Sequence, residues 1–206
     1  MIDTKACGCA IRTQEAALPQ CRAVSDEGGS MTNARKAMHS SQSVEWYTPS
    51  RYIEAARWVM GGIELDPASC ANANEIVRAQ KYFSQQSNGL VQSWYGRVWL
   101  NPPYGKTGNT SNQEIWLKKI WHEWSHMHIE QAIVLVNAVP DRQWFQGLWN
   151  YPICFTDHRI RFLDRYGDEQ KNPTHGNAFV YICNKADFQL RRFREGFTQF
   201  GHVVIP

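Results

Sequence analysis

Hydrophobic positions recur along this chain in two periods, and segments of the two kinds alternate from residue 44 onwards. Apolar residues three or four positions apart, together with capping residues, predict helices over residues 49–60, 72–79, 114–128, 142–149 and 187–193. Short apolar runs predict strands over residues 63–65, 96–100, 132–139, 153–155, 160–162, 178–183 and 202–205. Helices that alternate with strands predict an α/β fold, with helices on both faces of a mostly parallel sheet. The strands after residue 153 follow one another closely, which indicates an antiparallel edge.

The first 43 residues have a different composition. They are rich in Ala, Ser, Gly, Thr and Gln, contain no Phe, Trp or Tyr, and show no sustained periodicity. Such a segment cannot bury enough apolar surface to fold by itself. We therefore predict a disordered or weakly helical tail over residues 1–43 and one domain over residues 44–206.

Composition narrows the class of protein further. A chain of 206 residues with 43% hydrophobic residues suits one domain with a proper core. The net charge of +3 is compatible with a polyanionic partner but does not require one. No apolar run is long enough to span a membrane, so we expect no membrane partner. Cys7, Cys9 and Cys21 lie close together, but no histidine follows them at the spacing of a zinc finger, so we predict no metal.

Two predicted strands end in the same way. One is followed by Asp66 and Pro67 and the other by Asn101 and Pro102, so that a short polar residue precedes a proline each time. Proline cannot donate to a sheet and therefore stops the strand. Open α/β sheets bind ligands at the carboxyl ends of their strands, so we predict a ligand site at this edge. Asp66 and Pro67 alone also fit an ordinary turn.

The four residues from Asn101 to Tyr104, Asn-Pro-Pro-Tyr, suit one particular reaction. The amide of Asn101 and the carbonyl of Pro102 can accept hydrogen bonds from an exocyclic amino group. These bonds free the lone pair of the amine to attack an electrophile, while Tyr104 stacks on the flat ring that carries the amine. Such a site works by positioning and electrostatics rather than by acid–base chemistry. A turn that merely ends a strand is the structural alternative.

These residues carry a resemblance to a known family. Asn-Pro-Pro-Tyr after a hydrophobic strand resembles the signature of amino-group methyltransferases that use S-adenosylmethionine, and the chain is most similar to their phage-type DNA N6-adenine branch, the phage Dam family. The similar stretches are residues 45–49, 64–69, 81–83, 88–90, 96–105, 133–136 and 159–162.

The resemblance implies a fold and an activity. The fold is a three-layer Rossmann-like methyltransferase sheet, and the activity is transfer of a methyl group from S-adenosylmethionine to N6 of adenine in double-stranded DNA. Because a stacked base cannot reach such a pocket, base flipping is implied as well. We expect a monomer in the cytoplasm, which is the cytoplasm of a bacterial host if a phage or prophage encodes the protein.

The resemblance also assigns roles to residues. The implied catalytic residues are Asn101, Pro102, Pro103 and Tyr104. The implied cofactor-binding residues are Tyr47, Thr48, Pro49, Asp66, Pro67, Ala68 and Asn88. The substrate-binding candidates, chosen for their charge or their ring, are Lys106 in a polar loop over residues 105–113, Arg159, Arg161 and Phe162. Core packing is the alternative for Phe162.

The chain departs from the wider superfamily in two respects. It has no glycine-rich cofactor loop, and Asp66–Ser69 stands in its place. Only about 35 residues separate Asp66 from Asn101, too few for two strands and two helices, so we predict a somewhat reduced fold. The alternatives are the same chemistry on RNA, on a protein glutamine or on N4 of cytosine, and an inactive DNA-binding module. The missing glycine-rich loop favours the DNA branch over RNA or protein, and the intact motif argues against inactivity.

Overall fold

The computed structural model describes residues 46–164, 166–171 and 173–206, so the predicted tail over residues 1–43 lies outside the described residues. The helices are α2 (Ser50–Met60), α3 (Ala71–Val77), α4 (Asn112–Ser125), α5 (Asp187–Phe197) and the 3-10 helices η1 (Gln143–Asn150) and η2 (Thr198–Phe200). The strands are β1 (Leu65–Asp66), β2 (Lys81–Tyr82), β3 (Gly96–Leu100), β4 (Lys106–Thr107), β5 (Thr110–Ser111), β6 (Ile129–Asn137), β7 (Ile153–Thr156), β8 (Asn177–Ile182) and β9 (Gly201–Val204).

Seven of these strands form one mixed sheet in the order β2-β1-β3-β6-β8-β7-β9. The first four strands are parallel to one another. From β6 onwards each neighbour is antiparallel to the last. The α/β architecture is therefore as predicted, but the antiparallel part is half of the sheet rather than an edge.

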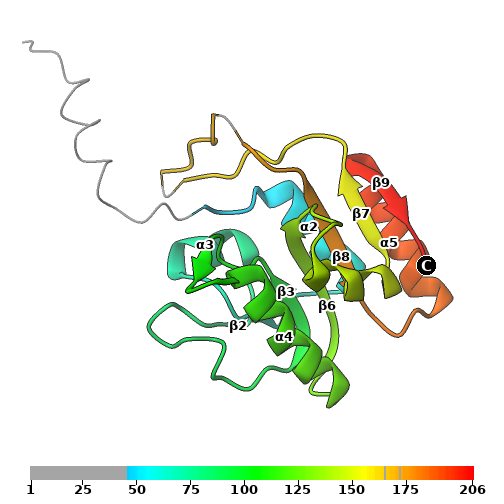
Figure 1. Cartoon of the computed structure of the whole chain (residues 1–206). Helices are drawn as coiled ribbons and strands as arrows, with labels where there is room; N and C mark the ends of the chain where they lie inside the picture. Colours follow the sequence, from blue (N-terminus) through cyan, green and yellow to red (C-terminus); the bar gives the residue numbers. More distant parts are fainter. Residues whose placement is uncertain (1–45, 165, 172) are drawn as a thin grey trace, which may run out of the picture. The chain divides into compact units, whose positions relative to one another are not determined.

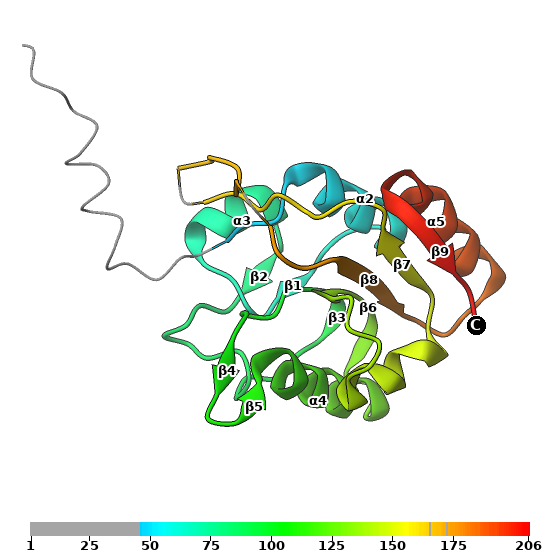
Figure 2. The same cartoon turned by 45° about the horizontal axis from the view of Figure 1, so that its top comes forward.

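The helices cover the sheet on both faces, which gives three layers. Figure 2 shows α2 and α5 on one side of the sheet and α4 on the other, and Figure 1 shows the same arrangement from another direction. Successive strand residues point to opposite faces, so Trp99 packs on the side of α2 and α5 while Val98 and Leu100 pack on the side of α4. These two apolar cores fix how the strand ends lie relative to one another.

The stretch between β1 and β3 is reduced, as its length predicts. It contains α3 and β2, whereas residues 83–95 form turns without a second helix. A Cβ at Gly89 would lie 2.0 Å from the carbonyl oxygen of Pro67, so only glycine allows this turn to pack against the loop after β1.

The helix predicted over residues 142–149 is present as the 3-10 helix η1. Two predictions of local structure are wrong. Residues 105–113 were expected as a loop and contain the hairpin of β4 and β5. Residues 160–162 form no strand, because β7 already pairs on both sides with β8 and β9. Leu163 instead forms an isolated bridge with Tyr47.

A candidate active site at the carboxyl edge of the sheet

Four polar side chains meet at one edge of the sheet. Asp66 ends β1, Asn101 follows β3 and Asn137 ends β6. The fourth, Asn177, begins β8 and pairs with Asn137 across the antiparallel register. Asp66 and Asn101 were predicted from the sequence, and the other two were not. Asn137 lay inside the strand predicted over residues 132–139, although it is the first polar residue after the apolar run over residues 132–136. Asn177 is recognisable only from the pairing of β8 with β6.

Asn101 is held from a distant part of the chain. Its side-chain Nδ2 donates to the hydroxyl of Thr48 over 3.2 Å, and Thr48 is buried. The Oδ1 atom of Asn101 is buried and accepts no hydrogen bond from any described residue. An unsatisfied buried acceptor costs about 1–3 kcal/mol, so this oxygen is a site where a ligand N–H would be stabilised. Of the two prolines that follow, Pro102 is buried and Pro103 is exposed.

The segment Tyr47–Pro49 lies beside the catalytic candidates. The backbone of Tyr47 exchanges two hydrogen bonds with Leu163, of 2.7 and 2.8 Å. Pro49 occupies the N-cap position of α2 and forms no side-chain cap, so Thr48 lies one residue before the cap. The hydroxyl of Thr48 is therefore available to Asn101 instead.

Asp66 is a buried carboxyl in the loop after β1. Its Oδ1 accepts the backbone N–H of Ala68 over 3.2 Å. Burial raises the pKa of Asp66 from 3.8 to about 7, because the ionised form loses its hydration. Asn88 precedes Gly89, the residue through which this turn packs on Pro67. The side chain of Asn88 is exposed, and its Oδ1 accepts the backbone N–H of Leu90. The structure therefore brings Asn88 near the loop of Asp66 and Pro67.

Tyr104 is fixed on three sides. Its backbone oxygen accepts the Nδ2 of Asn112 over 3.1 Å, and its hydroxyl lies 3.5 Å from the Nδ2 of Asn177. Its ring meets Phe162 edge-on, with centroids 5.8 Å apart and planes at 68°. Phe162 is buried, and burial also raises the pKa of the Tyr104 hydroxyl. The ring therefore has a defined orientation before any substrate arrives.

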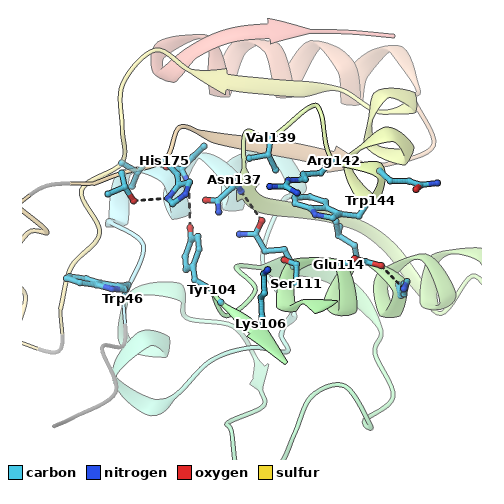
Figure 3. A pocket seen from close by; sticks show the side chains of 18 of the residues that line it. Trp46, Tyr104, Lys106, Ser111, Glu114, Asn137, Val139, Arg142, Trp144 and His175 are labelled. Atoms are coloured by element: carbon cyan, nitrogen blue, oxygen red, sulfur yellow. Dashed lines mark hydrogen bonds and ion pairs between the residues drawn. The ribbon is translucent and has the colours of Figure 1, made fainter. Parts of the chain in front are cut away.

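A cavity of about 1130 Å³ opens beside Tyr104 (Figure 3). Aromatic rings from separate segments line it, and three cationic side chains lie on its wall with one carboxylate. The rings belong to Trp46, Tyr104, Trp121, Trp144 and Phe162, and the charged side chains to Lys106, Lys118, Arg142 and Glu114. The cavity can therefore receive a flat ring attached to an anionic chain.

The four substrate-binding candidates lie in different places. Lys106 and Phe162 line the cavity, whereas Arg159 and Arg161 are not among the described residues that do. Arg159 donates to the carbonyl of Pro173 over 3.1 Å, and Arg161 pairs with Glu169 at 3.6 Å. Arg142 lies on the cavity wall and was missed, because its helix was interpreted from apolar periodicity alone.

The described part of the chain contains neither a group of metal-binding side chains nor a membrane-spanning helix. No three His, Cys, Asp or Glu side chains there are placed to hold a metal ion. Cys7, Cys9 and Cys21 lie outside it. None of the helices that the structure describes is long and apolar enough to cross a membrane.

The fold and the site define a class of protein. A mixed central sheet flanked by helices, with polar residues gathered at the carboxyl ends of its parallel strands, is compatible with a Rossmann-like methyltransferase fold. The chain matches the family described as DNA N-6-adenine-methyltransferase (Dam) over residues 35–193, which is most of its length, and it belongs to that family. Membership implies an enzyme that methylates N6 of adenine in DNA. No curated protein matches the chain.

Proposed function

We propose that this protein transfers a methyl group from S-adenosylmethionine to N6 of a specific adenine in double-stranded DNA, with the base flipped into the pocket beside Tyr104. Family membership supports the reaction. One observation carries the placement: the Oδ1 of Asn101 is buried, has no partner among the described residues, and lies at the strand end that leads to Tyr104.

The residues at the edge of the sheet fit the cofactor. S-adenosylmethionine, when bound, supplies a methyl group on a positively charged sulfur. Its ammonium group and hydroxyls suit Asp66, a buried carboxyl whose pKa of about 7 is raised by burial and would fall beside a cation. We assign Tyr47, Thr48 and Pro49 to the methionine part, Asp66, Pro67 and Ala68 to the loop that holds the cofactor, and Asn88 to its adenine.

Asn101 acts on the amino group of the substrate. Its Oδ1 and the carbonyl of Pro102 accept the two N6 hydrogens, which turns the lone pair of N6 out of conjugation with the ring. The new N–C bond would replace the S–C bond of the methyl donor, which would leave as a neutral thioether. Positive charge would then develop on N6, and these oxygens would stabilise it. N6 then releases one proton to solvent. Pro103 keeps the backbone of this motif rigid.

Tyr104 and the cavity beside it receive the base. An adenine within a duplex is stacked and paired, so the enzyme has to extrude it before reaction. Stacking on an aromatic ring contributes about 1–3 kcal/mol per base, and Tyr104 offers a ring that Phe162 and Asn112 hold in place. Lys106 and Arg142 line the cavity, and we assign them to the phosphates next to the flipped base.

The test is incubation of the purified protein with methyl-labelled S-adenosylmethionine and unmodified duplex DNA, followed by digestion to nucleosides and mass spectrometry. We expect label in N6-methyldeoxyadenosine. The matched control is Asn101→Ala, which should lose transfer while keeping its Tm and its affinity for S-adenosylhomocysteine.

Each other outcome identifies an alternative. Label in deoxycytidine would mean N4 methylation. Cofactor binding without label in DNA would favour an RNA or protein glutamine substrate. Absence of both would favour an inactive DNA-binding module. Global unfolding of Asn101→Ala would contradict its catalytic role.

A further inference from the structure

Gln113, in the wall of the cavity, has a buried hydrogen-bond donor without a partner in the described part of the chain. It is the second residue of α4, it is only 3% exposed, and it lines the cavity beside Tyr104. Its Oε1 accepts the backbone N–H of Asn137 over 3.2 Å, at the end of β6. Its Nε2 is buried and has no partner among the described residues. A buried donor in this condition is destabilising unless a ligand accepts its hydrogen bond.

The orientation of this amide follows from its surroundings. Only the oxygen of Gln113 can accept the N–H of Asn137, so the NH₂ group must be the end that remains free. Asn137 adds a second unsatisfied atom to the same wall, because its Oδ1 is also buried and without a partner in the described residues. Both atoms therefore indicate a polar ligand at this wall.

Gln113 and Tyr104 line the same cavity, and a chain of contacts connects them. Asn137 pairs with Asn177 across the sheet, and the Nδ2 of Asn177 lies 3.5 Å from the hydroxyl of Tyr104. Figure 3 shows Tyr104 and Asn137 together in the pocket, with a dashed line at Asn137 for its bond to the neighbouring amide. A base stacked on Tyr104 would therefore present one of its edges to this wall.

We propose that Gln113 reads the flipped base, by donating a hydrogen bond from Nε2 to the unprotonated ring nitrogen beside the reactive amino group. This inference rests on the function proposed above. In adenine that nitrogen is N1 or N7, depending on which edge faces the wall. On the N1 edge, guanine N1 and thymine N3 carry a hydrogen, so they would oppose one donor with another, and Gln113 favours a base with an amino group next to a free ring nitrogen. On the N7 edge, guanine N7 would also accept from Gln113, and guanine is then excluded by its O6 facing the acceptors that hold the amino group. In both cases the role of Gln113 differs from that of Asn101, which holds the amino group itself.

Two substitutions remove the donor in different ways. Gln113→Glu keeps an oxygen for the N–H of Asn137 and replaces the NH₂ group by a second acceptor. A carboxylate is tolerated in the first turn of a helix, where the helix dipole favours negative charge. Gln113→Met removes both polar atoms and adds no charge, so the pair remains informative if one variant fails to fold.

The experiment compares these variants on three versions of one synthetic duplex, in which the adenine that the enzyme methylates is deoxyadenosine, 7-deazadeoxyadenosine or 1-deazadeoxyadenosine. The wild-type enzyme should lose at least tenfold in kcat/KM on one analogue, and each variant should lose at least tenfold on normal DNA. On that analogue, the kcat/KM of each variant should be close to that of the wild type, because the analogue already lacks the hydrogen bond that the substitution removes. Affinity for S-adenosylhomocysteine and Tm should stay close to wild type.

The failures of the two proposals are distinguishable. If the wild-type enzyme labels no DNA, the proposed function fails and the role of Gln113 fails with it. If the wild-type enzyme labels DNA and folded Gln113 variants do so equally well, only the role of Gln113 is overturned. The role of Gln113 is also overturned if, on both analogues, a Gln113 variant loses as large a factor in kcat/KM as it loses on normal DNA, because the substitution and the analogue then remove independent interactions.

Discussion

The side-chain amide of Asn101 donates a hydrogen bond of 3.2 Å to the hydroxyl of Thr48, a residue 53 positions earlier in the chain. This bond joins the strand end after β3 to the segment that leads into α2. Under the proposed function, the first segment holds the reacting amine and the second contacts the cofactor. A single hydrogen bond therefore links the two halves of the site.

We predict that Thr48→Val lowers the rate of methyl transfer about tenfold, since a lost hydrogen bond of ordinary strength is enough for a change of that size. Valine has nearly the same shape but offers no acceptor, so the amide of Asn101 would lose its fixed orientation while the fold remains. Single-turnover kinetics with methyl-labelled cofactor measure the effect. Thr48→Ser is the control and should retain most of the rate. Equal rates for Thr48→Val and the wild type would show that this bond does not position Asn101.

Asn112 connects the motif to the helix that follows it. Its Nδ2 donates to the carbonyl of Tyr104 over 3.1 Å, and its Oδ1 accepts the hydroxyl of Thr107 over 2.7 Å. We predict that Asn112→Ala raises KM for DNA and lowers kcat, together about tenfold, because a small displacement of the stacking ring is costly. Its affinity for S-adenosylhomocysteine should not change. Thr107→Val, which removes only the bond to the hairpin, should have a smaller effect; the reverse order would contradict a role for Asn112 in holding Tyr104.

The part of the site that depends on strand ends could be predicted from the sequence. Asp66 and Asn101 follow apolar strands directly, and parallel neighbours bring their carboxyl ends to one edge. The positions of Gln113 and Asn177 could not be predicted in this way. They depend on the rotation of α4 over the sheet and on the register between β6 and β8, which local patterns do not contain.

The wrong local predictions have physical reasons. Ile160 and Phe162 are buried and Arg161 is exposed, so the burial of this irregular segment alternates as in a strand. The strands of the hairpin, β4 and β5, contain only polar residues, so no apolar run in the sequence predicts them. Gly108 and Asn109 between two threonines were nevertheless a turn signal, and Gly108 adopts the φ of 59° that such a turn requires.

Asp66 should make the stability of the protein depend on pH. Its pKa is about 7 in the folded chain, raised by burial from an ordinary 3.8. Between these two values the folded state holds a proton that the unfolded state has lost, so stability is highest at the acidic end and falls as pH rises. The difference corresponds to about 4 kcal/mol.

We predict that Asp66→Asn removes this dependence, because the amide stays neutral at every pH. Unfolding by urea between pH 4 and 7 measures it: the wild type should lose stability relative to the variant across that range, and the two should run parallel above it. Asp141→Asn is the control, since its side chain is 77% exposed. Parallel curves for the wild type and Asp66→Asn throughout the range would show that Asp66 is not the titrating group.

Lys106 and Arg142 should account for part of the salt dependence of DNA binding. Both side chains are exposed and both line the cavity beside Tyr104. Each phosphate contact makes the slope of log K against log salt concentration more negative by about 0.9. We predict that Lys106→Ala and Arg142→Ala each make that slope less negative by about this amount and weaken binding similarly for all DNA sequences. Fluorescence anisotropy across a salt series measures both effects.

Two other arginines serve as controls. Arg194→Ala on α5 should leave the slope unchanged, because this side chain is exposed and is not among the lining residues. Arg161→Ala should change the slope less than Arg142→Ala does. A larger loss from Arg161→Ala would place the DNA on the segment of Arg159 and Arg161 rather than along the cavity.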